Sequence, residues 1–130
     1  MGELRHPPVN ALTLADVFHA MSDPVRLEIV RRLADRREHA YAAFDFGLSR
    51  ATLSHHFRVL REAGLTRTRV EGKHRFVQLR HADLEARFPG LLGPVTGLLQ
   101  GGFGHPDARG VLSGGQALDR RTAQSSPPNL

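Results

Sequence analysis

The chain has 130 residues, of which 40% are hydrophobic and 24% are charged, a balance typical of one globular domain and not of a disordered chain. It contains no cysteine, which excludes disulfides and thiolate metal sites. The first ten residues hold no apolar run, and no stretch approaches the roughly 20 apolar residues of a membrane span. We therefore expect a soluble, cytoplasmic protein without a signal peptide or a membrane partner.

The formal net charge of +5 is unevenly distributed. Between residues 50 and 80, eight arginines and lysines stand against two glutamates, a local charge of +6, so the rest of the chain sums to −1. A positive charge confined to one segment favours a docking face for a polyanion such as nucleic acid.

The N-terminal third predicts a short arm and two helices. Residues 1–10 are polar and contain two consecutive prolines, so we expect a disordered arm there. Apolar residues recur at helical spacing over residues 11–21, which predicts a first helix. Asp23 and Pro24 then form the cap and first position of a second helix that reaches about residue 36.

The next segment has the pattern of a helix-turn-helix. Residues 38–46 predict only a short helical turn, which Gly47 ends. Ser49 is a good cap for a helix over residues 50–63, and Gly64 ends that helix. Two helices joined by a tight turn that contains glycine are typical of a helix-turn-helix motif.

A hairpin is expected directly after this motif. Residues 65–70 and 75–79 are β-prone runs, and the loop between them is centred on Gly72. A hairpin in this position is the wing of a winged helix.

The C-terminal part predicts two more helices and a tail. Asp83 is expected to cap one helix, and apolar residues line one face of another over residues 91–99. From residue 101 the composition turns to Gly, Ser, Pro and Gln, so we expect a disordered tail over 101–130 and one domain over 11–100.

The helix over residues 50–63 offers a face for reading DNA. Its apolar residues repeat at helical spacing and should be buried, and an α-helix fits the major groove with its N-terminal turns nearest the bases. Arg50, Ser54 and His55 are expected to read base edges, and the start of the helix is better placed for phosphates. The alternative interpretation is a solvated helix face. The candidate DNA-binding residues are Ser49, Arg50, Thr52, Ser54, His55 and Arg58.

The hairpin adds a second basic group. A β-ribbon tip with these charges can lie along the DNA backbone or reach the minor groove. Protection of an exposed sheet edge is the alternative, and it accounts for one or two cations but not for five basic residues. The candidates are Arg67, Arg69, Lys73, His74 and Arg75.

The run from Leu48 to Leu65, with its Ser-His-His and Arg-Glu-Ala-Gly-Leu segments, resembles the recognition-helix signature of ArsR-type winged-helix repressors. Residues 21–30 resemble the start of an earlier helix of that family, and Glu71-Gly72-Lys73 lies where its wing lies. The resemblance covers residues 11–88. It implies a mainly α (α+β) fold, a winged helix-turn-helix domain with a two-stranded wing.

The same resemblance implies a homodimer that represses promoters and pairs through its first and last helices. The residues that this pairing would use are Leu14, Val17, Phe18, Met21, Leu91, Leu92, Val95, Leu98 and Leu99.

The chain departs from the metal-sensing members of that family. Where many relatives carry a Cys-x-Cys motif, it has the segment 41–46 without a thiolate. Others bind zinc between C-terminal helices, whereas this chain offers His81 and Asp83 but no histidine over residues 84–103. We predict no metal and no cofactor, and a zinc-responsive repressor of the same fold stays as an alternative. The aromatic residues of 41–46 either line an effector pocket or pack a short helix.

No enzyme signature is present. Ser54 and His55 are adjacent on a helix and do not face each other, and hydrolase, phosphate-loop and HExxH motifs are absent. We predict a sequence-specific DNA-binding regulator with no enzymatic activity, acting on double-stranded DNA in the nucleoid as a homodimeric repressor of a near-palindromic operator. The remaining alternative is a winged helix that binds another protein, whose DNA binding would be weak and insensitive to salt.

Overall fold

A computed structural model of the protein describes residues 4–103. The elements in chain order are η1 (Val9–Ala11), α1 (Leu14–Ala20), α2 (Pro24–Leu33), β1 (His39–Ala40), η2 (Tyr41–Ala43), α3 (Arg50–Glu62), β2 (Thr66–Glu71), β3 (His74–Leu79), α4 (His81–Arg87) and α5 (Leu92–Gln100).

The start of α2 is formed by the residues that the sequence predicted. The Asp23 carboxylate accepts hydrogen bonds from the backbone N–H groups of Val25 and Arg26 at 2.7 and 3.3 Å, and Pro24 occupies the first position, where no N–H partner is needed. The cap is therefore as predicted, although the helix ends at Leu33, about one turn earlier than expected.

The end of α3 is a Schellman motif. The Leu65 N–H donates to the Leu60 carbonyl and the Gly64 N–H donates to the Arg61 carbonyl, both at 3.0 Å. Gly64 has a φ of 87°, a left-handed conformation that favours glycine. This ending turns the chain directly into β2 and so fixes where the hairpin leaves the helix.

The hairpin has the predicted antiparallel arrangement. Its register pairs Thr66 with Leu79 and Glu71 with His74, so the strands are joined by the two residues Gly72 and Lys73. The φ of 61° at Gly72 suits the turns that join such strands.

A third strand was not predicted. The strand order is β1-β3-β2, and His39 of β1 pairs with Val77 of β3. The expected helical turn over residues 38–46 is thus replaced by a two-residue strand followed by a single 3-10 turn, η2. Two residues are too short a segment to show the alternation that identifies a strand, and the pairing partner is distant in sequence.

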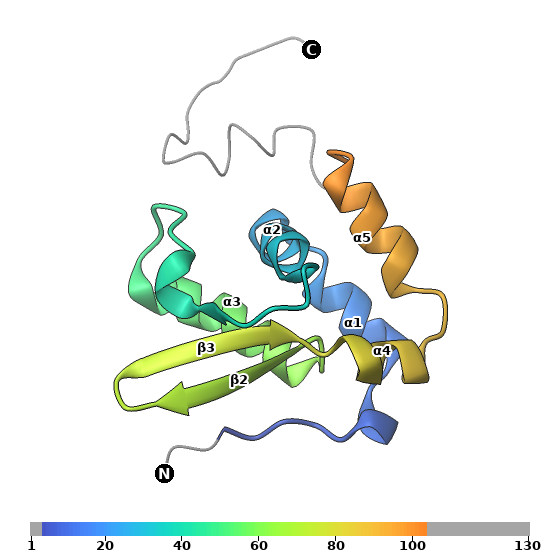
Figure 1. Ribbon diagram of the computed structural model, residues 1–130, viewed down its shortest axis with the longest axis horizontal. Helices are drawn as coiled ribbons and strands as arrows, with labels where there is room; N and C mark the ends of the chain where they lie inside the picture. Colours follow the sequence, from blue (N-terminus) through green and yellow to red (C-terminus); the bar gives the residue numbers. More distant parts are fainter. Residues whose placement is uncertain (1–3, 104–130) are drawn as a thin grey trace, which may run out of the picture.

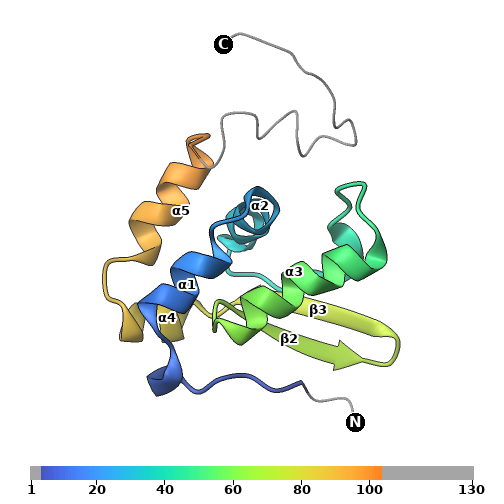
Figure 2. The same ribbon diagram turned by 180° about the vertical axis from the view of Figure 1, so that it is seen from behind.

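The helices and the sheet enclose one core. Figures 1 and 2 show α3 against one face of the hairpin, and α1 and α5 towards the end of the molecule away from the hairpin turn. The core takes apolar side chains from almost every element, and the most deeply buried include Val17, Ile29, Phe57, Val77 and Leu84.

The prediction of a disordered arm over residues 1–10 is wrong for residues 4–10, which are attached to the domain. Residues 4–10 lie along β2 (Figure 1), whose outer edge has no strand partner within residues 4–103. The Thr68 N–H donates to His6 Nε2 at 3.0 Å, and Arg80 Nη1 donates to the Pro7 carbonyl at 2.8 Å. The sequence did not show this attachment because its partners lie more than sixty residues further along the chain. The expected tail over 101–130 lies, from residue 104 onward, outside the described residues.

The helix after the wing also differs from its prediction. Asp83 lies in the first turn of α4 and does not cap it; the residue before the helix is Arg80. The Asp83 carboxylate accepts from Arg80 Nε at 3.0 Å. An acidic side chain in the first turn is still favourable to the helix dipole.

Candidate nucleic-acid interface

One face of α3 is exposed and polar. Arg50, Ser54, His55 and Arg58 are exposed, while Phe57 on the opposite face is buried in the core. Arg58 Nη2 lies 3.3 Å from His55 Nδ1, so two of these side chains are held side by side. The predicted division of the helix into an apolar inner face and a basic outer face is present.

The start of α3 is stabilised by two hydroxyl groups. Ser49 Oγ accepts from the Thr52 N–H at 3.1 Å and donates to Thr52 Oγ1 at 2.9 Å. These two residues were expected to contact phosphates, and their side chains cap the helix in this structure. The first N–H groups of the helix, at Arg50 and Ala51, have no partner within the helix and form its positive end.

An aromatic cluster orients α3 on the sheet. The Tyr41 ring stacks on Phe57 with centroids 3.9 Å apart, and Phe44 meets Phe57 edge-on at 5.4 Å. Tyr41 also shares a hydrogen bond of 2.8 Å with Thr68 Oγ1 on β2. Tyr41 and Phe44 thus pack against α3, and Phe46 packs against Phe44, as in the packing interpretation of the sequence.

Two of the five basic residues of the hairpin are engaged in ion pairs. Arg67 Nη2 lies 3.1 Å from Asp83 Oδ2. Arg69 binds Glu38 through two parallel hydrogen bonds of 2.9 Å, and it also binds Glu71. The hydrogen bonds to the two glutamates raise the pKa of Arg69 further above its ordinary value. Both acidic partners outside the hairpin, Glu38 and Asp83, come from segments distant in sequence.

The remaining basic side chains of the hairpin lie at its tip. Lys73, His74 and Arg75 are exposed, and no ion pair is recorded for them among residues 4–103. In Figures 1 and 2 the turn between β2 and β3 lies at the same end of the molecule as the start of α3. The start of α3, which carries Arg50, and the basic tip of the hairpin therefore lie at one end, as their use on a single polyanion requires.

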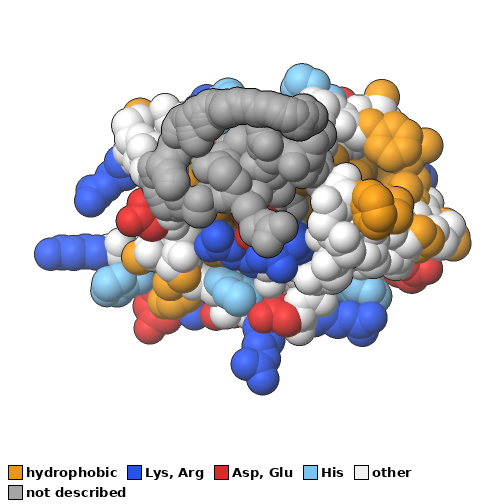
Figure 3. Space-filling model, turned by 90° about the horizontal axis from the view of Figure 1, so that it is seen from above, with side chains coloured by type: hydrophobic (Ala, Val, Ile, Leu, Met, Phe, Trp, Pro, Cys, Tyr) orange, Lys and Arg blue, Asp and Glu red, His pale blue; other side chains and the backbone are white. Residues whose placement is uncertain are grey.

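The opposite end of the molecule carries exposed apolar side chains. Leu14 is 43% exposed, Phe18 is 51% exposed and Leu98 is 57% exposed. Figure 3 shows hydrophobic side chains gathered at the α5 end, with long Lys and Arg side chains projecting at the other. The other residues expected in a dimer interface are partly or fully packed within the protomer, and the fully buried ones are Val17, Met21, Leu92 and Leu99.

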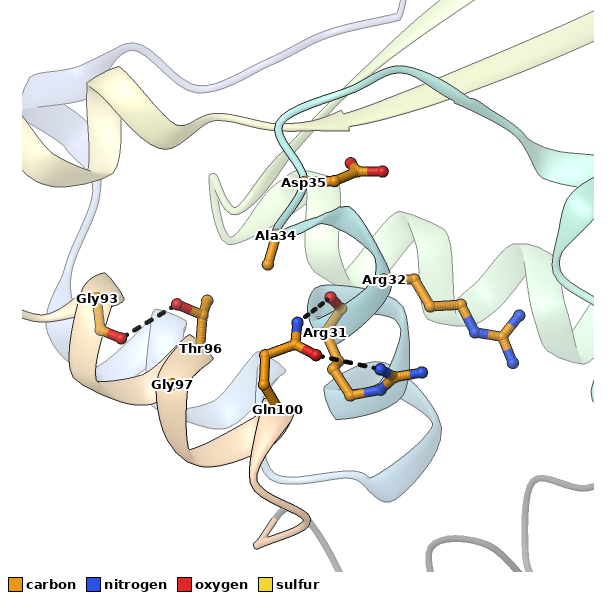
Figure 4. A pocket seen from close by; sticks show the side chains of 8 residues that line it. All are labelled: Arg31, Arg32, Ala34, Asp35, Gly93, Thr96, Gly97 and Gln100. Carbon is orange, nitrogen blue, oxygen red and sulfur yellow. Dashed lines mark hydrogen bonds between the residues drawn. The ribbon is translucent and has the colours of Figure 1, made fainter.

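A groove of about 470 Å³ runs between α2 and α5 (Figure 4). Gln100 bridges the two helices, because its amide N donates to the Arg31 carbonyl at 3.1 Å and its carbonyl accepts from Arg31 Nη1 at 3.3 Å. Thr96 Oγ1 donates to the Gly93 carbonyl at 3.1 Å. The other polar side chains of the groove are also engaged, because Arg32 binds Glu28 and Asp35 binds His39.

The described residues offer no cluster for a metal ion. No group of three or more His, Asp or Glu side chains with suitable placement occurs over residues 4–103. Asp83, one of the two candidate ligands named from the sequence, is held by Arg67 and Arg80, and these hydrogen bonds lower the pKa of its carboxyl group. In the same range, no helix is long and apolar enough to cross a membrane.

Known proteins share this arrangement. A family model described as a helix-turn-helix domain matches residues 21–69. The chain is 36% identical over 81 residues to YceK of Bacillus subtilis, an uncharacterized HTH-type transcriptional regulator. The matched segment covers 60% of this chain and 81% of YceK. It is 34% identical over 64 residues to MJ1325 of Methanocaldococcus jannaschii, which is also named an uncharacterized HTH-type transcriptional regulator. This match covers 48% of this chain and 72% of MJ1325.

A solved structure of a transcriptional repressor also resembles this protein. The transcriptional repressor BigR from Xylella fastidiosa superposes with a TM-score of 0.53 at 29% sequence identity, covering 67% of this chain and 83% of BigR. The three-stranded antiparallel sheet, the hairpin after α3 and the helices on either side of them define a winged helix-turn-helix protein.

The chain belongs to the HTH-type transcriptional regulators. The prediction of a winged helix-turn-helix transcription regulator is confirmed, and the predicted recognition-helix signature, residues 48–65, lies within the matched range. The protein is thus a regulator of the DNA-binding class and not an enzyme.

Proposed function

We propose that the protein is a homodimeric repressor that binds a near-palindromic operator in double-stranded DNA. The observation that carries this proposal is that the start of α3, with the exposed Arg50, and the hairpin turn, with the exposed Lys73, His74 and Arg75, lie at one end of the protomer (Figure 1). Two recognition helices related by a two-fold axis would enter successive major grooves, with half-site centres about 34–36 Å apart. Its place of action is the cytoplasm, where the DNA lies.

The exposed side chains divide between two tasks in this proposal. Arg50, Ser54 and His55 read base edges, because they lie in the first turns of α3. Arg58 contacts the backbone from the same helix. The hairpin tip lies along the phosphates or in the minor groove. Arg67 and Arg69 would have to exchange their carboxylate partners for phosphates, so we assign the backbone contacts chiefly to Lys73, His74 and Arg75.

A second copy of the chain is the proposed occupant of the apolar end. The exposed side chains of Leu14, Phe18 and Leu98 supply the contact, Leu91 and Val95 are half-buried beside it, and the buried interface candidates support it from within the protomer. Sedimentation should give a dimer for the wild type. Phe18→Glu and Leu98→Glu should give a monomer, and Leu48→Glu, at an exposed leucine on the other end, should remain dimeric. A dimer that survives both substitutions contradicts this interface.

Selection of bound duplexes from a random pool at physiological salt tests the DNA-binding proposal, with and without zinc. We expect one enriched near-palindromic sequence that is the same in both conditions. Enrichment that changes with zinc would favour a metal-responsive repressor. Failure to enrich any sequence, with binding that is weak and insensitive to salt, would favour a protein-binding winged helix.

Two substitutions test the division of tasks. Arg50→Ala should cost roughly 1–3 kcal/mol on the selected operator and relax the preference at one base position. Arg75→Ala should weaken binding to operator and random DNA alike and reduce the slope of log K against log salt by about one unit. If both variants lose affinity equally on the two DNAs, the assignment of α3 to bases and of the hairpin to phosphates is wrong.

A further inference from the structure

A buried cation lies between α2 and α3. Arg26 is 7% exposed and His56, on the inner side of α3, is 8% exposed. Arg26 Nη1 lies 3.0 Å from His56 Nδ1. A guanidinium carries donors only, so the imidazole nitrogen is the acceptor. The His56 ring that makes this bond is therefore neutral and carries its proton on Nε2.

The same arginine also reaches α1. Arg26 Nε donates to the carbonyl of Ala20, the last residue of α1, at 2.7 Å. One side chain of α2 is thus bonded to the end of α1 and to α3. Within residues 4–103, no other hydrogen bond between α2 and α3 is recorded.

Directional bonds and apolar contacts constrain a helix differently. The apolar residues of α3, such as Phe57 and Leu60, hold it against the core, but such contacts do not depend on direction and tolerate small rotations. A hydrogen bond weakens steeply with misalignment. His56 directly follows Ser54 and His55 in the chain, so the bond to Arg26 adds a directional constraint, beside the aromatic contacts of Phe57, on the part of α3 that carries these two side chains.

We propose that Arg26 and His56 form a positioning latch, which sets the angle at which α3 presents its base-reading side chains. This inference rests on the proposed function of α3. Base-edge contacts require positions accurate to about 0.5 Å and 10–20°, an accuracy that one directional bond from a rigid neighbouring helix can supply. His56 acts through the placement of α3 and does not touch DNA.

The latch also joins the two functional ends of the protomer. Its α1 contact, at the Ala20 carbonyl, lies two residues after Phe18, which belongs to the proposed dimer surface. The distance between the two recognition helices in a dimer depends on how rigidly α3 is held to α1. A loosened latch should therefore reduce the preference for correct half-site spacing as well as for sequence.

The latch holds only while His56 is neutral. Burial lowers the pKa of His56, the Asp23 carboxylate raises it, and the charges of Arg26 and His55 lower it, with a net decrease from 6.5. A lowered pKa in the folded protein means that the contribution is complete above about pH 6.5 and is lost as the pH falls through the folded value. A protonated ring cannot accept from Arg26 and repels it.

Three variants separate positioning from mere packing. His56→Asn keeps an acceptor at the δ1 position and does not titrate. His56→Leu keeps a side chain of similar size but removes the acceptor nitrogen. The buried guanidinium of Arg26 then loses its partner on α3. His55→Asn, at the exposed neighbour, is the control for titration next to DNA. Each is measured by affinity for the selected operator and for random DNA between pH 8 and pH 5.5, with circular dichroism to verify folding.

We expect His56→Leu to lower the ratio of operator affinity to random affinity about tenfold or more at pH 7.5. Random binding should stay within about threefold, because the exposed cations are unchanged. His56→Asn should keep the ratio within about threefold and should lose the wild-type decrease of the ratio at acid pH, whereas His55→Asn should retain that decrease. A folded His56→Leu with an unchanged ratio, or a His56→Asn with the wild-type pH profile, overturns the proposal. If the leucine variant does not fold, the asparagine pH profile decides.

A readout without DNA keeps this inference separate from the proposed function. In ¹⁵N NMR spectra at pH 7.5, His56 Nδ1 should give the shift of an unprotonated acceptor nitrogen, and the amide signals of α3 should move in His56→Leu but hardly in His56→Asn. A proton on Nδ1, or α3 signals that respond equally to both variants, refutes the latch. A wild type that binds no duplex refutes only the proposed function.

Discussion

Replacing Gly64 by alanine should lower the free energy of unfolding by roughly 2–4 kcal/mol. The left-handed φ of 87° costs a residue with a Cβ about 1 kcal/mol. The new Cβ would also lie 2.1 Å from Leu12 Cδ2, and Leu12 is itself buried. Forcing such a side chain to move costs roughly 1–3 kcal/mol in a packed core. The sum is a large part of the roughly 5–15 kcal/mol that stabilises a typical domain.

Urea unfolding followed by circular dichroism, at one fixed protomer concentration, measures this loss. Gly72→Ala is the matched control, because its φ of 61° is also left-handed but nothing lies within 4 Å of the added Cβ. It should lose only the backbone cost of about 1 kcal/mol. In a Leu12→Ala background, Gly64→Ala should likewise lose only about 1 kcal/mol, since the clash is gone. An equal loss at Gly64 in both backgrounds would refute the steric part of the reasoning.

Three further predictions concern attachments between elements. Asp23→Ala removes the carboxylate that caps α2 and should lower the free energy of unfolding in urea by about 1–2 kcal/mol. Tyr41→Phe removes the hydrogen bond to Thr68 and should cost about 1 kcal/mol, measured by thermal unfolding. Burial and neighbouring arginines lower the pKa of His6 from 6.5, so the hydrogen bond from the Thr68 N–H to His6 is complete above about pH 6.5 and should be lost as the pH falls further. The hydrogen-exchange protection factor of the Thr68 amide should drop on acidification in the wild type and remain steady in His6→Gln; protection that falls equally in both contradicts the role of His6.

Local sequence patterns predicted the elements that position the candidate interface. The cap at Ser49, the helical repeat that ends at Leu60 and the glycine at position 64 lie within one continuous segment, and they predicted α3 almost to the residue. The hairpin followed from the β-prone runs on either side of the loop centred on Gly72. In each case the interaction that determines the structure lies within the segment itself.

Contacts between distant segments could not be predicted in the same way. The pairing of His39 with Val77 and the bond from Thr68 to His6 join residues far apart in the chain. The bidentate ion pair between Glu38 and Arg69 is of the same kind, and it reduces the number of free cations in a segment that looked uniformly basic. Helical periodicity likewise marked α1 as amphipathic but did not separate the residues that fill the protomer core from those left on its surface.

The arm along β2 has a practical consequence for anyone who produces this protein. An edge strand with open N–H and C=O groups is a template for pairing with another chain, and residues 4–10 cover that edge, with His6 accepting from the Thr68 N–H of β2 and Pro7 accepting from the Arg80 side chain beyond it. Shortening the N-terminus, or fusing a bulky purification tag directly to it, would uncover the strand and invite sheet-to-sheet aggregation.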